Sequence, residues 1–256
     1  MIFAIVKIPL FLVTLVSYIL ISLAVEALVR NENIKLKWLT KITSIGSTIS
    51  LWIFGISVTV TNRPLEKDAL QKVLVISNHL SYLDIFIISS LFPSLYITSV
   101  EVQRMFFLGL MTRLGGSLFI ERRSKTLLLK EIDRIADILK RGNTITLFPE
   151  GTSSNGENVL PFKGALFTAA EKAAVPIQPI CLKYTLINGK PITSKNRDYA
   201  YYYGDLEFFP HLVKLFFVRS IKVHVTFLTQ HSNLQGDRKN LVNHVFTSIS
   251  ESYNQV

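Results

Sequence analysis

Cysteine is almost absent from this chain, since Cys181 is the only one among 256 residues. A single cysteine excludes an internal disulfide and a cysteine-rich zinc site, and it suits a reducing compartment. Charged residues are also scarce, at 18%, whereas hydrophobic residues reach 49%. A composition so poor in charge excludes a disordered or fibrous protein and indicates contact with a membrane.

Acidic residues are the rarer charged type, with 18 Asp and Glu against 28 Lys and Arg, so the formal net charge is +10. A basic surface attracts nucleic acid and anionic lipid headgroups alike. None of the usual nucleic-acid-binding motifs accompanies this charge. We therefore expect membrane lipids as partners and no nucleic acid.

Long hydrophobic runs are concentrated at the N-terminus. Residues 1–28 are almost wholly apolar apart from Lys7 and Glu26, and their length approaches the ~20 residues that cross a bilayer. No clear signal-peptide layout is present, so we expect an uncleaved anchor. Residues 36–60 are more polar, which leaves open a hairpin in one leaflet or a spanning helix followed by a surface helix.

The rest of the chain alternates short β-branched runs with helical patterns. The expected strands are 73–76, 96–98, 117–120, 144–148, 177–182 and 222–227, and the expected helices include 125–140, 164–174 and 237–253. This alternation predicts an α/β fold with a mixed, largely parallel sheet flanked by helices. We assign residues 1–60 to a membrane-anchoring helical region and 61–256 to a catalytic domain on the cytoplasmic face of the inner membrane.

A histidine, a hydroxyl and a carboxylate follow the first expected strand, in the stretch SNHLSYLD. His79 falls at the carboxyl end of that strand, and Asp84 falls in the first turn of a helix that begins near Ser81. His79 could accept a proton from a substrate hydroxyl while Asp84 orients its ring. Alternatively, Ser81 and Asp84 form a helix capping box. This stretch alone leaves both interpretations open.

Two further polar stretches follow expected strands. In FPEGT, the turn at Gly151 and Thr152 can direct backbone N–H groups at an anion, while Glu150 supplies a fixed carboxylate. Arg122 lies just beyond the apolar run LFI, after Glu121, and offers planar donors to a phosphate or carboxylate. Taken alone, each stretch also fits a surface loop or a solvated face.

Together these motifs resemble the glycerolipid acyltransferases of the lysophosphatidic-acid acyltransferase type. Residues 78–84 resemble the family's NHxSxxD block, 148–152 its FPEGT block, 118–122 its FIDR-like block and 175–180 its proline block. The resemblance implies an O-acyltransferase with His79 as the general base and Asp84 as its orienting partner. It also implies substrate-binding residues near the acceptor headgroup, namely Ser81, Arg122, Glu150, Gly151 and Thr152.

Direct acyl transfer is the reaction that we expect. The chain has no Gly-x-Ser-x-Gly elbow and no cysteine beside a histidine, so it offers no obvious covalent nucleophile. His79 would deprotonate the free hydroxyl of a lysolipid, and the oxygen would attack an acyl thioester of CoA or acyl carrier protein. We expect no metal and no cofactor beyond this co-substrate.

The acceptor is less sharply indicated than the reaction. We favour lysophosphatidic acid, because Arg122 and the Gly151-Thr152 turn suit a phosphate. The stretches YGD at 203–205 and PHL at 210–212 resemble the lyso-ornithine lipid acyltransferase branch, so that acceptor stays open. Two other classes are a lysolipid hydrolase and a non-catalytic lipid-binding protein. The thioester donor implied by the family disfavours the first, and the intact His79, Asp84 and Glu150 disfavour the second.

Overall fold

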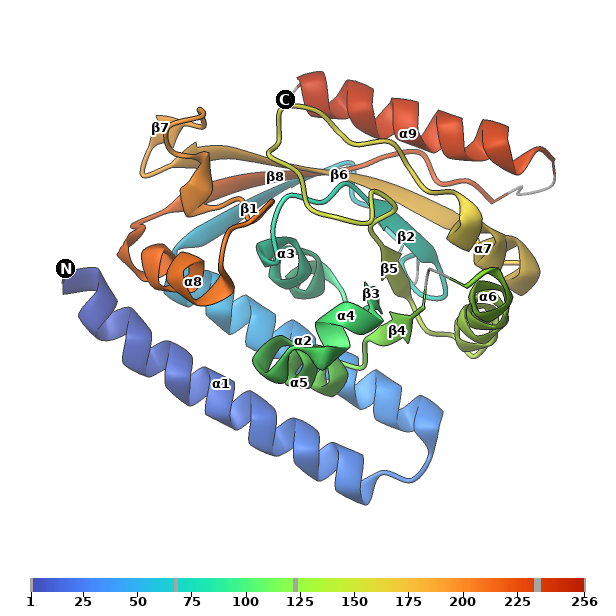
Figure 1. Cartoon of the computed structure of the whole chain (residues 1–256), viewed down its shortest axis with the longest axis horizontal. Helices are drawn as coiled ribbons and strands as arrows, with labels where there is room; N and C mark the ends of the chain where they lie inside the picture. Colours follow the sequence, from blue (N-terminus) through green and yellow to red (C-terminus); the bar gives the residue numbers. More distant parts are fainter. Residues whose placement is uncertain (1, 67–68, 122–123, 233–235, 256) are drawn as a thin grey trace.

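The computed structural model describes residues 2–66, 69–121, 124–232 and 236–255. Figure 1 shows a central sheet between two sets of helices. The long helices α1 (Ile2–Leu28) and α2 (Glu32–Phe54) run along one side, and α9 (Arg238–Gln255) covers the opposite side. The catalytic candidates of the sequence therefore fall within an α/β core that has helical layers on both faces.

Among the described residues, the sheet has eight strands in the order β1-β8-β6-β2-β5-β3-β4, with β7 paired to β6 beside this path. Neighbouring strands are parallel except where β6 pairs with β7 and β8. The predicted mixed, largely parallel sheet is thus confirmed. The strands are β1 (Ile56–Thr61), β2 (Leu74–Ser77), β3 (Leu95–Ser99), β4 (Leu118–Ile120), β5 (Ile145–Leu147), β6 (Ile177–Ile187), β7 (Lys190–Pro191) and β8 (Ile221–Phe227).

The remaining helices connect and cover these strands. Their bounds are α3 (Leu83–Leu91), α4 (Val100–Arg104), α5 (Phe106–Leu114), α6 (Lys125–Lys140), α7 (Thr168–Ala173) and α8 (Phe208–Phe217), with 3-10 turns η1 (Ala165–Phe167) and η2 (Arg197–Tyr199). All six expected strands and the three expected helices are present. The sequence analysis did not predict β1, β7, α4, α5 or α8.

Helix α2 leads directly into the sheet through Gly55. This glycine ends the helix with φ at 72°, and a Cβ there would lie 2.4 Å from the carbonyl oxygen of Arg219. Both features require glycine. β1 then pairs in parallel with β8 from Ile56 to Thr61. The expected division after residue 60 falls inside this strand, so removing residues 1–60 would also remove most of an edge strand.

Helix α1 is also fixed to the rest of the chain. The buried Lys7 donates from Nζ to the carbonyl oxygens of Phe54, at 2.9 Å, and Val218, at 2.6 Å. These carbonyls lie at the C-terminal ends of α2 and α8, where helices lack internal partners. The ring of Phe11 packs against those of Phe54 and Phe216, with centroids 5.1 and 5.6 Å apart. One cation and three aromatic rings therefore join α1, α2 and α8.

The N-terminal helices form a hairpin, and α1 carries the apolar surface. Asn31 caps α2 by accepting from the N–H of Ile34 at 3.1 Å. Residues 3–28 form a helix that is long and apolar enough to cross a membrane, and only 11% of its most apolar stretch is buried. Apolar side chains exposed over such a length favour lipid over water. This helix supports membrane association.

Candidate active site

The candidate active site forms where β2 and β5 end side by side. The two strands are parallel, with Ile76 opposite Leu147, so the chain leaves both at the same edge of the sheet. His79 follows β2 and Glu150 follows β5. Because open α/β sheets collect their reactive groups at the carboxyl ends of strands, this topology explains why two distant motifs meet.

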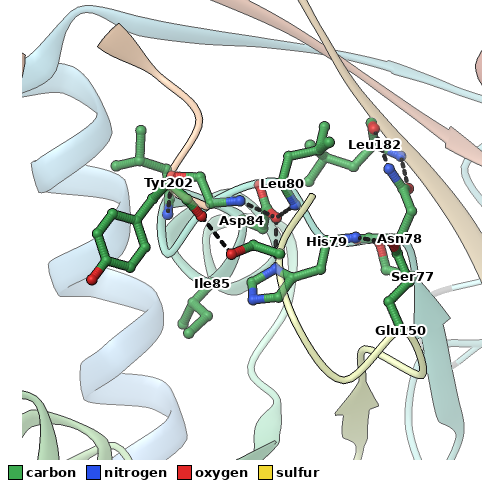
Figure 2. A network of polar contacts seen from close by, with 12 residues as sticks. Ser77, Asn78, His79, Leu80, Asp84, Ile85, Glu150, Leu182 and Tyr202 are labelled. Atoms are coloured by element: carbon green, nitrogen blue, oxygen red, sulfur yellow. Dashed lines mark hydrogen bonds and ion pairs between the residues drawn. The ribbon is translucent and has the colours of Figure 1, made fainter. Parts of the chain in front are cut away.

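His79 and Asp84 form a close pair. The Nδ1 atom of His79 lies 2.8 Å from Oδ2 of Asp84 (Figure 2). The histidine side chain is 19% exposed, whereas the aspartate side chain is fully buried. A carboxylate facing Nδ1 holds the proton on that atom, which leaves Nε2 as the basic nitrogen of the neutral ring. The pair therefore has the geometry of a general base and its orienting group.

Asp84 is held by donors on both of its oxygens. Oδ2 also accepts from the backbone N–H groups of Leu80, at 2.6 Å, and Ser81, at 3.0 Å. Oδ1 accepts from the hydroxyl of Tyr184 at 2.7 Å. A buried carboxylate needs such partners because it has lost its hydration. Rotating Asp84 would break several hydrogen bonds at once, so it fixes the orientation of His79.

The capping interpretation is half realised at the start of α3. Asp84 accepts from the N–H of Ser81, as the last residue of a capping box does. In return, the hydroxyl of Ser81 accepts only a long contact of 3.4 Å from the N–H of Leu83. The two interpretations left open by the sequence therefore meet in Asp84, which caps the helix and orients the histidine.

Glu150 is buried and connects three chain segments. Its Oε1 accepts from the N–H of His79 at 2.7 Å, and its Oε2 accepts from the N–H of Leu160 at 3.0 Å. Burial raises the pKa of Glu150 to about 7, although the two N–H donors counteract this rise. The contacts seen here position the backbone of His79. Binding of substrate by Glu150 stays a prediction.

The FPEGT turn holds His79 by two further contacts. The ring of Phe148 stacks on the imidazole, with centroids 4.1 Å apart and planes 14° from parallel. The carbonyl oxygen of His79 accepts from the N–H of Ser154 at 3.0 Å. Gly151 closes the turn with φ at 77°, a value that favours glycine. His79 is therefore fixed through its ring and its backbone.

The other expected substrate-binding residues have varied positions. Thr152 is exposed at the mouth of this turn, and Gly151 is partly exposed beside it. Ser81 is fully buried within the turn before α3. Arg122 lies outside the described residues. The structure thus brings His79, Asp84, Glu150 and Gly151 to one sheet edge, and substrate contacts by this set stay predictions.

Tyr184 and Asn78 complete the site, and the sequence analysis gave neither of them a role. Asn78 exchanges two hydrogen bonds of 2.8 Å with the backbone of Leu182, which attaches the end of β2 to β6 (Figure 2). Tyr184 lies two residues beyond that point on β6. Its role depends on the pairing of β2 with β6, which local sequence does not reveal. The available signal was a tyrosine just beyond the expected strand 177–182, because the hydroxyl of a buried tyrosine usually has a hydrogen-bond partner.

An almost wholly apolar cavity of about 150 Å³ lies next to the site. Tyr96 lines it and stacks on Phe148, with ring centroids 6.2 Å apart, and Phe148 in turn stacks on His79. Ile85, the residue after Asp84, lines it as well. The other lining residues come from several helices and include Phe11, Gly46, Ser47, Ser50, Phe107, Met111, Phe208 and Leu212. The stacked rings of Tyr96 and Phe148 therefore separate the cavity from the candidate base.

A second histidine lies close by in a different environment. The Nδ1 atom of His211 lies 2.9 Å from the hydroxyl of Tyr82, a residue that lines the cavity. Burial lowers the pKa of His211 to about 4, so its ring is neutral at pH 7. Within the described residues, no cluster of three His, Cys, Asp or Glu side chains could hold a metal ion. The expected absence of a metal stays a prediction.

Comparison with known proteins adds a family to this geometry. The model of the Acyltransferase family matches residues 57–183. The matched residues include His79, Asp84 and Glu150, and they end one residue before Tyr184. The lyso-ornithine lipid O-acyltransferase of Rhizobium meliloti (strain 1021) is 32% identical over 70% of this chain, and the match spans 63% of that protein. The enzyme of the same name from Brucella abortus (strain 2308) is 32% identical over 76% of this chain and 75% of its own.

The chain is also similar to proteins that are named as acyltransferases of a different lysolipid. The 1-acyl-sn-glycerol-3-phosphate acyltransferase of Neisseria gonorrhoeae is 39% identical over 46% of either chain. The crystal structure of the 1-acyl-sn-glycerophosphate acyltransferase PlsC from Thermotoga maritima matches 98% of this chain and 95% of its own, with a TM-score of 0.66 and 18% identity. That likeness extends the shared fold to the N-terminal hairpin. By its motifs, its fold and these relatives, the chain belongs to the acyltransferase family.

Proposed function

We propose that this protein is a lysolipid O-acyltransferase that uses His79 as its general base. The observation that carries the proposal is the pairing of His79 Nδ1 with the buried Asp84 at 2.8 Å. This pairing leaves Nε2 to accept a proton, and the ring is partly exposed. An apolar cavity beyond the stacked rings of Phe148 and Tyr96 offers space for an acyl chain.

The proposed reaction is a direct transfer. Nε2 of His79 takes the proton of the lysolipid hydroxyl as the oxygen attacks the carbonyl carbon of the thioester. Backbone N–H groups stabilise the resulting oxyanion. The intermediate then collapses, the C–S bond breaks, and the thiolate takes the proton from the imidazolium. Asp84 stabilises the imidazolium between these two steps.

The apolar cavity suits the acyl chain of a substrate. The surface that the cavity exposes is almost wholly apolar, although hydroxyl residues such as Ser47 and Thr112 are part of the lining, and binding sites for apolar ligands have this character. Tyr96 and Phe148 lie between the cavity and His79, so in this proposal the cavity holds the part of the chain that is distant from the carbonyl. The proposed contacts for the acceptor headgroup are the exposed Thr152 and also Arg122, which lies outside the described residues.

Two acceptors are proposed in order. Lysophosphatidic acid is the first, because an arginine and an N–H-rich turn suit a phosphate. Lyso-ornithine lipid is the second, and a specific observation favours it, since relatives with that name align with 70% and 76% of this chain. Competition between the two lysolipids in one reaction reports the ratio of their kcat/KM values. Arg122→Ala should raise the KM of lysophosphatidic acid, and Arg122→Lys should restore part of the loss.

The proposed setting is the cytoplasmic face of a membrane, with CoA or acyl carrier protein bringing the acyl group. Purified full-length protein is incubated with an acyl thioester and the two lysolipids, and thiol, diacyl product and free fatty acid are all measured. A transferase releases thiol and diacyl product in equal amounts. Free fatty acid without diacyl product would indicate a hydrolase, and the absence of all three products would indicate a binding protein.

A further inference from the structure

Helix α8 exposes a stripe of large apolar side chains. Phe209 is 59% exposed, Val213 54% and Phe217 53%. These residues are four positions apart, so they share one face of the helix. The opposite face is buried, with Leu215 and Phe216 in the core. The described residues therefore leave more than half of each of these three side chains exposed on the surface.

The start of α5 continues this surface. Phe106 is 95% exposed and Met105 is 45% exposed. The next residue, Phe107, packs its ring against Phe208 and Phe209 of α8, with centroids 5.9 and 5.7 Å apart. We call Met105, Phe106, Phe209, Val213 and Phe217 the α5–α8 apolar face. Phe107 therefore joins the start of α5 to the start of α8, which bear exposed members of this face.

The apolar face adjoins the helix that is apolar enough to cross a membrane. Both α5 and α8 contact α1, and Figure 1 shows them beside it, on the side of the sheet opposite α9. Phe11 of α1 packs on Phe216 of α8, and Lys7 of α1 binds the carbonyl of Val218 at the end of α8. The three helices therefore keep a fixed geometry, and lipid around α1 would lie close to α5 and α8.

Basic side chains accompany the face. Arg104 precedes Met105, Lys214 follows Val213, and Arg219 follows α8, and all three are exposed. An apolar stripe bordered by Lys and Arg is typical of helices that lie in the interface of anionic membranes. The exposed phenylalanines, the adjacent cations and the neighbouring helix α1 together favour a lipid surface over a soluble protein as the partner of this face.

We propose that the α5–α8 apolar face inserts into the headgroup–acyl boundary of the leaflet that holds α1. The proposal rests on the membrane attachment through α1 and extends it to a second contact. It also has a consequence for the position of the apolar cavity. Phe208 and Leu212 line this cavity on the inner side of α8. With the outer side of α8 in lipid, the cavity wall that α8 forms lies against the bilayer.

Single-cysteine labelling of the full-length protein tests this placement. Cys181 is buried and is the only cysteine, so Cys181→Ala gives a background without thiols. Phe106→Cys, Phe209→Cys and Val213→Cys are each labelled with an environment-sensitive fluorophore. Val13→Cys reports α1, where Val13 is 66% exposed, and Asn243→Cys reports the exposed side of α9. Only variants that melt at the temperature of the labelled Asn243→Cys protein are compared.

The labelled proteins are placed in anionic vesicles whose lipids carry a nitroxide either near the headgroup or near the chain end. We expect quenching at positions 106, 209 and 213, stronger with the shallow nitroxide than with the deep one, and none at position 243. Quenching at position 13 alone would overturn the proposal, and it would still support membrane attachment through α1. No quenching at any position would overturn both. A blue-shifted emission without quenching at 209 and 213 would show that protein covers the face, which also overturns it.

Discussion

Tyr184 donates a hydrogen bond of 2.7 Å to Oδ1 of Asp84, the oxygen that does not face His79. The two residues are 100 positions apart, and both are buried. Burial and the negative charge of Asp84 raise the pKa of Tyr184 well above its ordinary value, so the phenol keeps its proton and acts as a donor. We therefore expect Tyr184 to act through Asp84 as a positioning residue for the proposed base, His79.

The first prediction concerns Tyr184→Phe, which removes this donor and keeps the ring. A hydrogen bond to a charged group is worth about 1.5–3 kcal/mol, so we expect kcat to fall by roughly tenfold to a hundredfold with little change in KM. The fall comes from a less firmly oriented Asp84 and therefore a less firmly oriented His79. A lower melting temperature with an unchanged kcat would mean that Tyr184 has only a structural role.

The second prediction concerns pH and Glu150. Burial raises the pKa of this carboxyl to about 7 from its ordinary value of 4.5. Between these pH values the folded protein binds a proton that the unfolded chain has released, so the contribution of Glu150 to the free energy of unfolding falls as the pH rises. The fall is about 3 kcal/mol over this window.

Glu150→Gln tests this linkage because glutamine does not titrate. The free energy of unfolding of the wild type minus that of the variant should decrease from pH 4.5 to pH 7 and stay level above it. Denaturant unfolding at a series of pH values measures this difference. A difference that is constant over the whole range would contradict the raised pKa.

The Glu150→Gln variant can also place its amide N–H₂ group against the backbone N–H of His79, so that two donors face each other. We then expect His79 to shift and the activity to fall.

The third prediction concerns the apolar cavity. Gly46 of α2 lines it, and a Cβ added there would lie 3.6 Å from Tyr18, an ordinary contact. Gly46→Leu should fill part of the cavity and shift the preference toward shorter acyl chains, whereas Gly46→Ala should leave the preference unchanged. Competition among acyl thioesters of graded length measures the shift. An equal effect of both variants would contradict binding of the acyl chain in this cavity.

The sequence predicted those parts of the fold that local patterns determine. The strands at 73–76 and 144–148 are short β-branched runs, and their parallel pairing brings His79 and Glu150 together as an α/β fold requires. β1 was missed because its residues follow the apolar end of α2 without a break in composition. Its strand character depends on pairing with β8, which is far away in the chain. Tyr184 was missed for the same reason.

The apolar elements of the site were also beyond local prediction. Helices α5 and α8 are short apolar stretches, and periodicity alone does not separate such stretches from buried strands. The cavity that they enclose with α1 and α2 exists only after these four helices pack. The resemblance to a family supplied the chemistry of the site, and the long-range packing supplied the partners that hold it in place.

His79→Ala tests the central claim most directly when thiol and diacyl product are measured together. His244→Ala is the matched control, because His244 lies exposed on α9, across the sheet from α1. We expect His79→Ala to lose both products while it melts at the wild-type temperature, since its ring lies at the edge of the site and not in the core. His244→Ala should keep full activity. Near-normal formation of diacyl product by His79→Ala would contradict the account.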